Sequence, residues 1–573
     1  MLSASPFHIF FDPLCAIWRC IVSSTAPERK LDASKTPVFV QTDNGMSLFS
    51  IPVLNAPAIY SLSSLQTKTK NKTATHPPNQ NPKTKQLQND WIVCKKNTKM
   101  LILNILPIIF MIYNILNIVY TLLITVPSAI FRPIRPYTKP FLKKHPKMTY
   151  SLILFALALS VYGISCKFSN PFLLTFVLLA VFRYLRFIVN ILAYSTLKGY
   201  PVRNNPTFTS SDVSVVVPTV FADKDEVMAC LKRVRVCSPR QIIVVTREDL
   251  VPSVYAACAE VTAAATEEKE KLNAVQVIGV SQLNKRTQMV AALQQAVTGS
   301  IVAFADDDVF WPGDDFITAM LACFENPEVG ACGPSQRVCR STGAKESTGF
   351  VNFLGICYLE RRNFNTGATN LIDGAVSTLS GRTSFYRASL IQNDEFYDYF
   401  MNALNHDDDK NLTRWVYDQG LQITLNFSPK ARIMTTLETT PYKFIRQCMR
   451  WARGHWRGNF RVMQTTTYWY DTHPWSLYAI YIGQFQTPAF LIDGSLFALL
   501  YFGLSDYDTF HRTYSLCLLG CWIFFTKIVK IIPHFLEFPQ DMVFIPAMLA
   551  FSYWHGVMNV YALITRENKG WGR

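Results

Sequence analysis

Residues 300–308 read SIVAFADDD, an apolar run that ends in three consecutive aspartates, Asp306, Asp307 and Asp308. A short, continuous apolar run is typical of a strand that is buried on both faces of a sheet. Three earlier stretches have the same character: 213–218 (VSVVVP), 241–246 (QIIVVT) and 275–280 (VQVIGV). Helix-like patterns at 225–234 and 285–297 alternate with these runs. This order predicts an α/β domain with a mostly parallel sheet and right-handed crossovers.

The three aspartates follow the carboxyl end of a predicted strand, which is where α/β sheets bind ligands. Carboxylates this close raise one another's pKa unless a cation neutralises them. Mg²⁺ or Mn²⁺ is a suitable partner, because it takes one or two carboxylates together with the phosphates of a substrate. In this interpretation Asp306 and Asp308 are the metal ligands, and Asp307 projects to the other side. A solvated turn or a helix N-cap is the alternative, and residues 311–313 (WPG) would favour it.

Basic residues open the helical pattern that precedes this strand. Lys285 and Arg286 follow Asn284 at the start of that pattern. The backbone N–H groups at a helix N-terminus attract phosphate, and adjacent cations strengthen the attraction. An ordinary basic surface is the alternative.

A second acidic cluster follows about a hundred residues later, where Asp407, Asp408 and Asp409 precede Lys410 and a helix-like stretch. Crowded carboxylates that are tuned by their neighbours suit a general base. Acidic residues are also favoured at the N-cap of a helix. The spacing leaves both interpretations open.

Residues 446–461 (RQCMRWARGHWRGNFR) mix cations with aromatic side chains. Gln447, Arg450 and Trp451 have the spacing i, i+3 and i+4, so a helix would place them on one face. A tryptophan ring can stack on a sugar ring, and an arginine can offset the charge of a diphosphate. An interfacial helix that only anchors the chain to a membrane is the alternative.

The composition favours a membrane protein with a soluble insert, because 13% of the 573 residues are aromatic and 17% are charged. A net charge of +16 could indicate a nucleic-acid partner. The Lys and Arg residues cluster at the ends of apolar blocks, however, where membrane topology explains them, so we predict no nucleic-acid partner. The fourteen cysteines form no CxxC pairs, which predicts reduced thiols.

Six apolar blocks are candidates for membrane-associated helices: 101–130, 149–166, 171–194, 475–504, 513–532 and 542–565. The basic loop after the first block predicts a cytosolic position, and the next two blocks form a hairpin. Residues from about 205 to 460 are therefore predicted to be cytosolic. Three final crossings would leave the C-terminus outside, although Arg566, Lys569 and Arg573 favour the inside. We therefore expect one of these blocks to be interfacial or to break at Pro488 or Pro546.

These features divide the chain into five parts. Residues 1–99 are predicted to form a disordered or poorly ordered tail, because the polar stretch 64–99 cannot bury enough apolar surface to fold. The other parts are N-terminal transmembrane helices (100–200), the α/β domain (201–440), interfacial amphipathic helices (441–470) and C-terminal transmembrane helices with a terminal WGR segment (471–573).

Seven motifs in this order resemble those of the processive, membrane-embedded family 2 glycosyltransferases, a group that contains hyaluronan, cellulose and chitin synthases. They are VVVPT (215–219), NKRTQM (284–289), ADDD (305–308), LSGRTSFYR (379–387), DDDKNLTRW (407–415), QCMRW (447–451) and KGWGR (569–573). The resemblance covers residues 150–573 and is greatest to the hyaluronan-synthase-like polysaccharide synthases of fungi. It implies a Rossmann-like GT-A domain in the cytosol, joined to a helical transmembrane region.

The resemblance also implies roles for individual residues. Asp306 and Asp308 correspond to a pair that binds Mg²⁺ or Mn²⁺ and the diphosphate, and Asp409 corresponds to the catalytic base, with Asp408 beside it. Contacts to the nucleotide sugar are implied for Lys285, Arg286, Asp306, Thr219, Asp249 and Arg450. Acceptor contacts are implied for Trp451, Gln447, Ser380, Gly381 and Arg382, and a gate over the nucleotide for Trp571 and Arg573.

Three positions depart from the family pattern. Asp407 stands where the family has a glycine before its two acids. Thr246 replaces an aspartate that often reads uracil, so Glu248 or Asp249 is expected to take that role. The terminal motif lacks the spacer that the family has before the position of Arg573.

The activity that the resemblance implies is inverting, processive transfer of a sugar from a UDP-sugar to a growing extracellular or cell-wall polysaccharide. The product would be exported through the plasma membrane, and Gln484, Gln486, Asp493, His555 and Asn559 are predicted to line the channel. One alternative is a non-processive membrane glycosyltransferase that acts on a lipid or a single acceptor. Another is a membrane transporter or scaffold without catalysis. The sequence is also compatible with a homo-oligomer.

Overall fold

The computed structural model describes residues 170–263, 275–282, 284–340, 349–403, 407–465 and 473–568, together with one hairpin near the N-terminus. The chain divides into two units, residues 1–118 and 119–573, which are described separately. In the first unit, β1 (Val38–Thr42) pairs antiparallel with β2 (Gly45–Phe49), within the predicted tail. The rest of that tail, the predicted apolar blocks 101–130 and 149–166, and the terminal Trp571 and Arg573 lie outside the described residues.

The second unit contains a mixed sheet whose described strands run in the order β5-β4-β3-β6-β9-β8-β11-β7, with β10 paired to β8. The strands are β3 (Val213–Pro218), β4 (Gln241–Arg247), β5 (Val275–Val280), β6 (Ile301–Ala305), β7 (Val309–Phe310), β8 (Val329–Val338), β9 (Thr383–Arg387), β10 (Gln422–Asn426) and β11 (Arg432–Thr435). The neighbours β5, β4, β3 and β6 are parallel, whereas β9 runs antiparallel between β6 and β8. The predicted, mostly parallel α/β sheet is confirmed.

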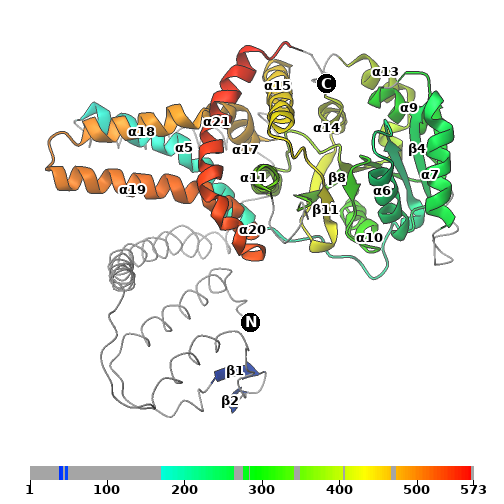
Figure 1. Cartoon of the computed structure of the whole chain (residues 1–573), viewed down its shortest axis with the longest axis horizontal. Coiled ribbons are helices and arrows are strands. Elements are labelled where there is room, and N and C mark those ends of the chain that lie inside the picture. The colour runs from blue at the N-terminus through cyan, green and yellow to red at the C-terminus, as the bar shows by residue number, and fades with distance from the viewer. Residues whose placement is uncertain are drawn as a thin grey trace, which may run out of the picture. The chain divides into compact units, whose positions relative to one another are not determined.

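Both faces of this sheet are covered by helices, as Figure 1 shows. Successive residues of β3 explain why: Val215 and Val217 join one apolar core, and Val216 joins the other. The first core receives side chains from α6 (Lys224–Val236), α7 (Val251–Ala263) and α10 (Phe316–Leu321). The second receives them from α9 (Lys285–Gln295), α13 (Asp394–Asn402) and α14 (Asp408–Asp418). Two layers of helices therefore hold the carboxyl edge of the sheet in a fixed position.

Three helical segments in the described residues are long and apolar enough to cross a membrane. The first is α5 (Pro171–Ser195). The second, Thr509–Glu537, contains α19 (Thr509–Ile528), η8 (Val529–Ile531) and α20 (Ile532–Glu537). The third, Pro539–Ile564, contains η9 (Pro539–Phe544) and α21 (Ile545–Ile564). A further pair, Pro474–Gln486 and α18 (Ala489–Gly503), passes the same test together but is bent by 82°. The break lies at Pro488, one of the two predicted positions, whereas Pro546 lies in the first turn of α21. The cysteines among the described residues form no disulfides with one another.

Polar side chains of this helical region are mostly engaged by their neighbours. Asn559 donates to His555 (2.9 Å), and Gln484 accepts from Asn459 (3.2 Å). Gln486 donates to the carbonyl of Phe182 (2.6 Å), next to the Pro488 break. The Phe182 carbonyl belongs to the unbroken helix α5, so this bond connects the helix pair around the break to α5. These contacts therefore stabilise the helical bundle.

Candidate active site

The aspartates that follow β6 point in different directions. Lys285, the first residue of α9, binds the Asp306 carboxylate at 2.5 Å. Thr219, at the end of β3, donates to the Asp307 carboxylate at 2.5 Å. The backbone N–H of Asp306 donates to the carbonyl of Arg382 (2.9 Å), which ties the aspartates to the loop before β9. The carboxyl ends of two adjacent parallel strands thus bring Thr219, Asp306 and Asp307 to one place.

Among the three aspartates, the surroundings of Asp308 most clearly indicate a binding site for a ligand. One of its carboxylate oxygens, Oδ1, is buried and has no hydrogen-bond partner in the described part of the chain. Burial, followed by repulsion from Asp306, raises the pKa of Asp308 to about 7. Burial also raises the pKa of Asp307, although the hydrogen bond from Thr219 opposes that rise. Charge neutralisation at this edge of the sheet is incomplete, so a cation would be stabilised there.

The donor set fits a divalent cation that a substrate helps to hold. Asp306 and Asp308 offer hard carboxylate oxygens, and one oxygen of Asp308 is unused. The described residues contain no group of three or more His, Cys, Asp or Glu side chains that could hold a metal ion by themselves. Mg²⁺ and Mn²⁺ often bind through one or two carboxylates plus phosphate oxygens, so these two residues suffice for such a site.

The second acidic cluster lies at the start of α14. Asp407 occupies the N-cap position but makes no side-chain capping bond. Arg286 binds Asp408 at 2.5 Å and also donates to the carbonyl of Ala403 (2.8 Å). Burial raises the pKa of Asp408, and the hydrogen bond from Arg286 opposes that rise. Asp409 Oδ2 accepts from the backbone N–H of Gly381 at 2.9 Å. The two carboxylates of this first turn therefore have different partners.

Lys285 connects the two clusters. Burial lowers the pKa of Lys285, but the carboxylates of Asp306, Asp409 and Asp408 outweigh burial and raise that pKa above its ordinary value. One cation thus interacts with acidic residues that lie about a hundred positions apart in the chain. The structure brings together Lys285, Arg286, Asp306 and the pair Asp408–Asp409, all of which were candidates from the sequence.

The aromatic part of the site comes from α11 (Phe350–Asp373) and α15 (Pro441–Thr465). Trp451 packs on Tyr358 with ring centroids 4.9 Å apart, and the Arg382 guanidinium lies 5.4 Å from the centroid of the Trp451 ring. Gln447 Oε1 is buried and has no hydrogen-bond partner within the described ranges. Arg450, predicted on the same helix face, is exposed. Trp451 is therefore linked through Arg382 to the loop that contacts Asp306 and Asp409.

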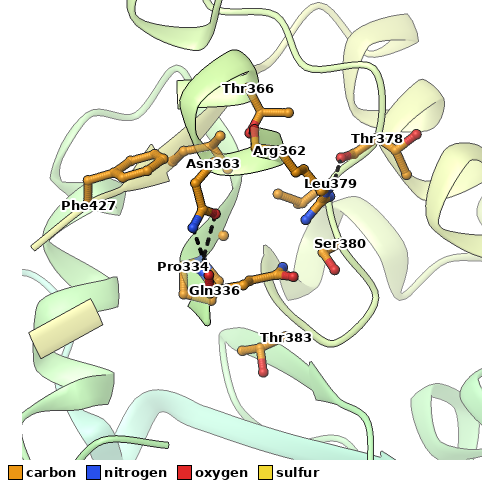
Figure 2. Close-up of a pocket in the computed structure, with 12 residues that line it drawn as sticks. Pro334, Gln336, Arg362, Asn363, Thr366, Thr378, Leu379, Ser380, Thr383 and Phe427 are labelled. Carbon is orange, nitrogen blue, oxygen red and sulfur yellow. Dashed lines mark hydrogen bonds between the residues drawn. The ribbon is translucent and has the colours of Figure 1, made fainter. Parts of the chain in front are cut away.

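A polar pocket lies behind this loop, and Figure 2 shows side chains from α11, β8 and the loop around it. Arg362 donates to the carbonyl of Thr378 (3.2 Å), and Asn363 donates to the carbonyl of Gln336 (2.7 Å). Gln336 in turn accepts from Arg382 (3.3 Å). Ser380 and Thr383 also line the pocket. Sequence reasoning missed Tyr358, Arg362, Asn363 and Gln336, because no motif spacing marks them.

The remaining candidates lie apart from these contacts. Asp249 is exposed and pairs with Arg247, whose Nη2 donates to Asp249 Oδ2 at 2.6 Å. The hydroxyl of Thr246 is buried and has no hydrogen-bond partner in the described residues. The structure thus gives Asp249 a surface ion pair.

The mixed, mostly parallel sheet with acidic residues at its carboxyl edge is that of a GT-A-like sugar transferase domain, and in this chain it is joined to apolar helices. Residues 211–454 match the family described as "Glycosyltransferase like family 2". The chain is 36% identical over 430 residues to a type 2 glycosyltransferase of Gibberella zeae, a match that covers 73% of this chain and 78% of the relative. It is also 36% identical over 406 residues to a type 2 glycosyltransferase of Zymoseptoria tritici, covering 69% and 82% respectively. The chain belongs to the family 2 glycosyltransferases.

Among solved structures, a mannosyltransferase from Pyrobaculum calidifontis in complex with GDP-Man and Mn²⁺ aligns with a TM-score of 0.45 and 15% identity. That alignment covers 69% of this chain and 99% of the mannosyltransferase.

The close approach of Gly381 to Asp409 gives a first test of the site. A Cβ at residue 381 would collide with the Asp409 carboxylate, whose Cγ would be 2.9 Å away. We expect Gly381→Ala to lower glycosyl transfer about 100-fold, because a displacement of roughly 1 Å at a reacting group has effects of that size. Initial rates of transfer check this. Gly349→Ala is the matched control, since nothing lies within 4 Å of a Cβ there. Full activity of Gly381→Ala would contradict a requirement for this position of Asp409.

Proposed function

We propose that the chain is an inverting, processive glycosyltransferase that moves a sugar from a UDP-sugar to the end of a growing polysaccharide. Its catalytic domain would face the cytosol, and its helical region would guide the product across the plasma membrane. The main support is the arrangement around Lys285, which interacts with both Asp306 and Asp409. Sugar transfer requires the donor diphosphate and the acceptor hydroxyl to lie close together, and a site between Asp306 and Asp409 would bring them together.

The donor half of the mechanism rests on the edge of the sheet. Lys285 and Arg286 at the start of α9 would attract the diphosphate, together with the N–H groups of that helix end. Asp306 and Asp308 would hold Mg²⁺ or Mn²⁺, which when bound supplies positive charge to the departing diphosphate. Thr219, Asp249 and Arg450 are proposed as further nucleotide contacts. Of these three residues, Thr219 has the best-supported role, because its hydroxyl donates to Asp307 beside the proposed metal ligands.

Asp409 is proposed as the base of the acceptor half. Its carboxylate would take the proton of the acceptor hydroxyl as the hydroxyl oxygen bonds to the anomeric carbon and UDP leaves from the opposite face. The N–H of Gly381 fixes the orientation of this carboxylate. Asp408 is less suited to the same task, because Arg286 already binds it.

Trp451 is proposed to hold the acceptor sugar by stacking, with Gln447, Ser380 and Arg382 supplying polar contacts. Tyr358 and Arg382 restrict the orientation of its ring. An acceptor that is held against Asp409 reacts faster because its hydroxyl is already aligned with the donor.

The base assignment predicts that Asp409→Asn lowers transfer by about 10² to 10⁴-fold, the usual contribution of general base catalysis. Binding of UDP should change little, because Lys285 and the metal-binding aspartates remain. Initial rates of UDP release and calorimetric titration with UDP measure the two effects. Asp418→Asn, at the far end of α14, is the matched control. Retained synthesis in Asp409→Asn would refute the assignment.

The metal assignment predicts a different pattern for Asp308→Ala. This change removes the buried carboxylate with the unused oxygen, so Mn²⁺ should no longer strengthen UDP binding. Titration calorimetry with UDP, with and without Mn²⁺, measures the effect. An equal gain from Mn²⁺ in the variant and the unaltered protein would show that Asp308 is not a ligand.

Processivity predicts the size distribution of the product. If Trp451 keeps the growing chain bound between additions, long polymers should appear early, while most acceptor remains unextended. Incubation with labelled UDP-GlcNAc, UDP-GlcA and UDP-Glc, singly and in pairs, followed by size separation, tests this. A single sugar added to a lipid or another small acceptor would instead support the non-processive alternative.

A further inference from the structure

A group of basic side chains lies among the apolar helices, away from the acidic site. Arg183 and Arg186 belong to α5, and Lys527 and Lys530 lie at the end of α19 and in η8. Arg361 joins them from α11, which packs against α5 and η8. Figure 1 shows α5 alongside α18 and α19 in this part of the structure. We call these five residues the basic cluster.

Three members of the basic cluster have acceptors. Arg183 and Lys527 bind opposite oxygens of Asp493 on α18, at 3.5 Å and 3.1 Å. Arg183 also donates to the carbonyl of Gln486 (2.6 Å), and Arg186 donates to that of Ala479 (2.8 Å). Both arginines of α5 and Lys527 therefore have acceptors within the helical bundle around the Pro488 break.

Arg361 and Lys530 differ from the other three. Within the described ranges, neither has a hydrogen bond or an ion pair. The Lys530 ammonium lies 5.4 Å from the ring centroid of Phe187 and 5.8 Å from that of Phe364. It is repelled by Arg361 and by the other three members of the basic cluster. Phe187 follows Arg186 in α5, and Phe364 lies three positions after Arg361 in α11, so Lys530 sits where these two helices meet, with no acceptor for its ammonium group among the described residues.

This arrangement is costly in such surroundings. Four of its members lie on segments that are apolar enough to cross a membrane, α5 and Thr509–Glu537, and Arg361 lies on α11, which packs against both of these segments. Ionised side chains within apolar helices usually pair with an opposite charge or face a polar cavity. Aromatic faces offset part of the charge of Lys530, but they do nothing for Arg361. An anion between Arg361 and Lys530 would remove the repulsion.

We propose that Arg361 and Lys530, surrounded by Arg183, Arg186 and Lys527, form a binding site for a phosphate group. Cations that converge from three helical segments suit an anion with several oxygens, and an arginine fork binds two of them at once. Basic pockets between membrane helices bind lipid headgroups in this way. The phosphate would come from an anionic membrane lipid or from free phosphate. This site goes beyond the proposed transfer reaction and does not depend on it.

The test uses the full chain, purified in detergent and stripped of lipid. Thermal unfolding is followed with inorganic phosphate, with vesicles of phosphatidylcholine, and with vesicles that also contain phosphatidic acid. We expect phosphatidic acid to raise the unfolding temperature above that in phosphatidylcholine. A rise with inorganic phosphate as well would identify free phosphate as a second source. Both outcomes support the site, whereas no rise with either phosphate source overturns it.

Variants locate the effect. Arg361→Gln and Lys530→Gln should weaken phosphatidic acid binding at least about tenfold, as expected for loss of a charge-assisted bond. Lys530→Arg should retain it, and so should Lys443→Gln, which removes an exposed cation from α15. Equal binding in the glutamine variants and the unaltered protein would sink the proposal.

Native mass spectrometry covers the case in which the glutamine variants aggregate. The unaltered protein and Lys530→Arg should each retain phosphatidic acid in a one-to-one complex that survives detergent exchange. Failure of both to retain it, under conditions where the fold is intact, would also overturn the site.

Discussion

The arrangement of the candidate active site depends on the ammonium group of Lys285. It interacts with Asp306 after β6 and with Asp408 and Asp409 on α14. Without a cation between them, these half-buried carboxylates would repel one another. Arg286, the next residue, performs a similar task by binding Asp408. The first turn of α9 therefore determines how closely the end of the sheet and the start of α14 can approach.

The loop before β9 connects Asp306 and Asp409 through its backbone. The carbonyl of Arg382 accepts from Asp306, and the N–H of Gly381 donates to Asp409. Backbone groups are suited to this task, because they hold a carboxylate without adding a charge. A glycine is required where the carboxylate of Asp409 approaches, since any Cβ would occupy its space. The loop also reaches Trp451 through the Arg382 side chain, so two consecutive residues, Gly381 and Arg382, contact the proposed donor, base and acceptor positions.

Local patterns predicted the elements of the fold and several of the residues that meet around Lys285. β3 and β5 have the predicted bounds because strands that are buried on both faces read as uninterrupted apolar runs, and the helix break falls at Pro488 because proline cannot continue the bonding pattern. The antiparallel position of β9 and the polar contacts of Arg362 and Gln336 could not be predicted in this way. They depend on which segments meet in space, and neither residue belongs to a pattern of its own.

Helix α11 connects the catalytic edge to the membrane-associated helices through two adjacent arginines. Neighbouring residues in a helix project about 100° apart, so Arg361 and Arg362 face different surroundings. Arg362 holds the carbonyl of Thr378, two residues before Ser380, whereas Arg361 is repelled by Arg183 of α5. One helix therefore contacts both the loop that holds Asp409 and, through its packing against α5 and η8, the apolar bundle. Because adjacent side chains of α11 serve these two surroundings, the position of the loop relative to the bundle is fixed by the packing of a single helix.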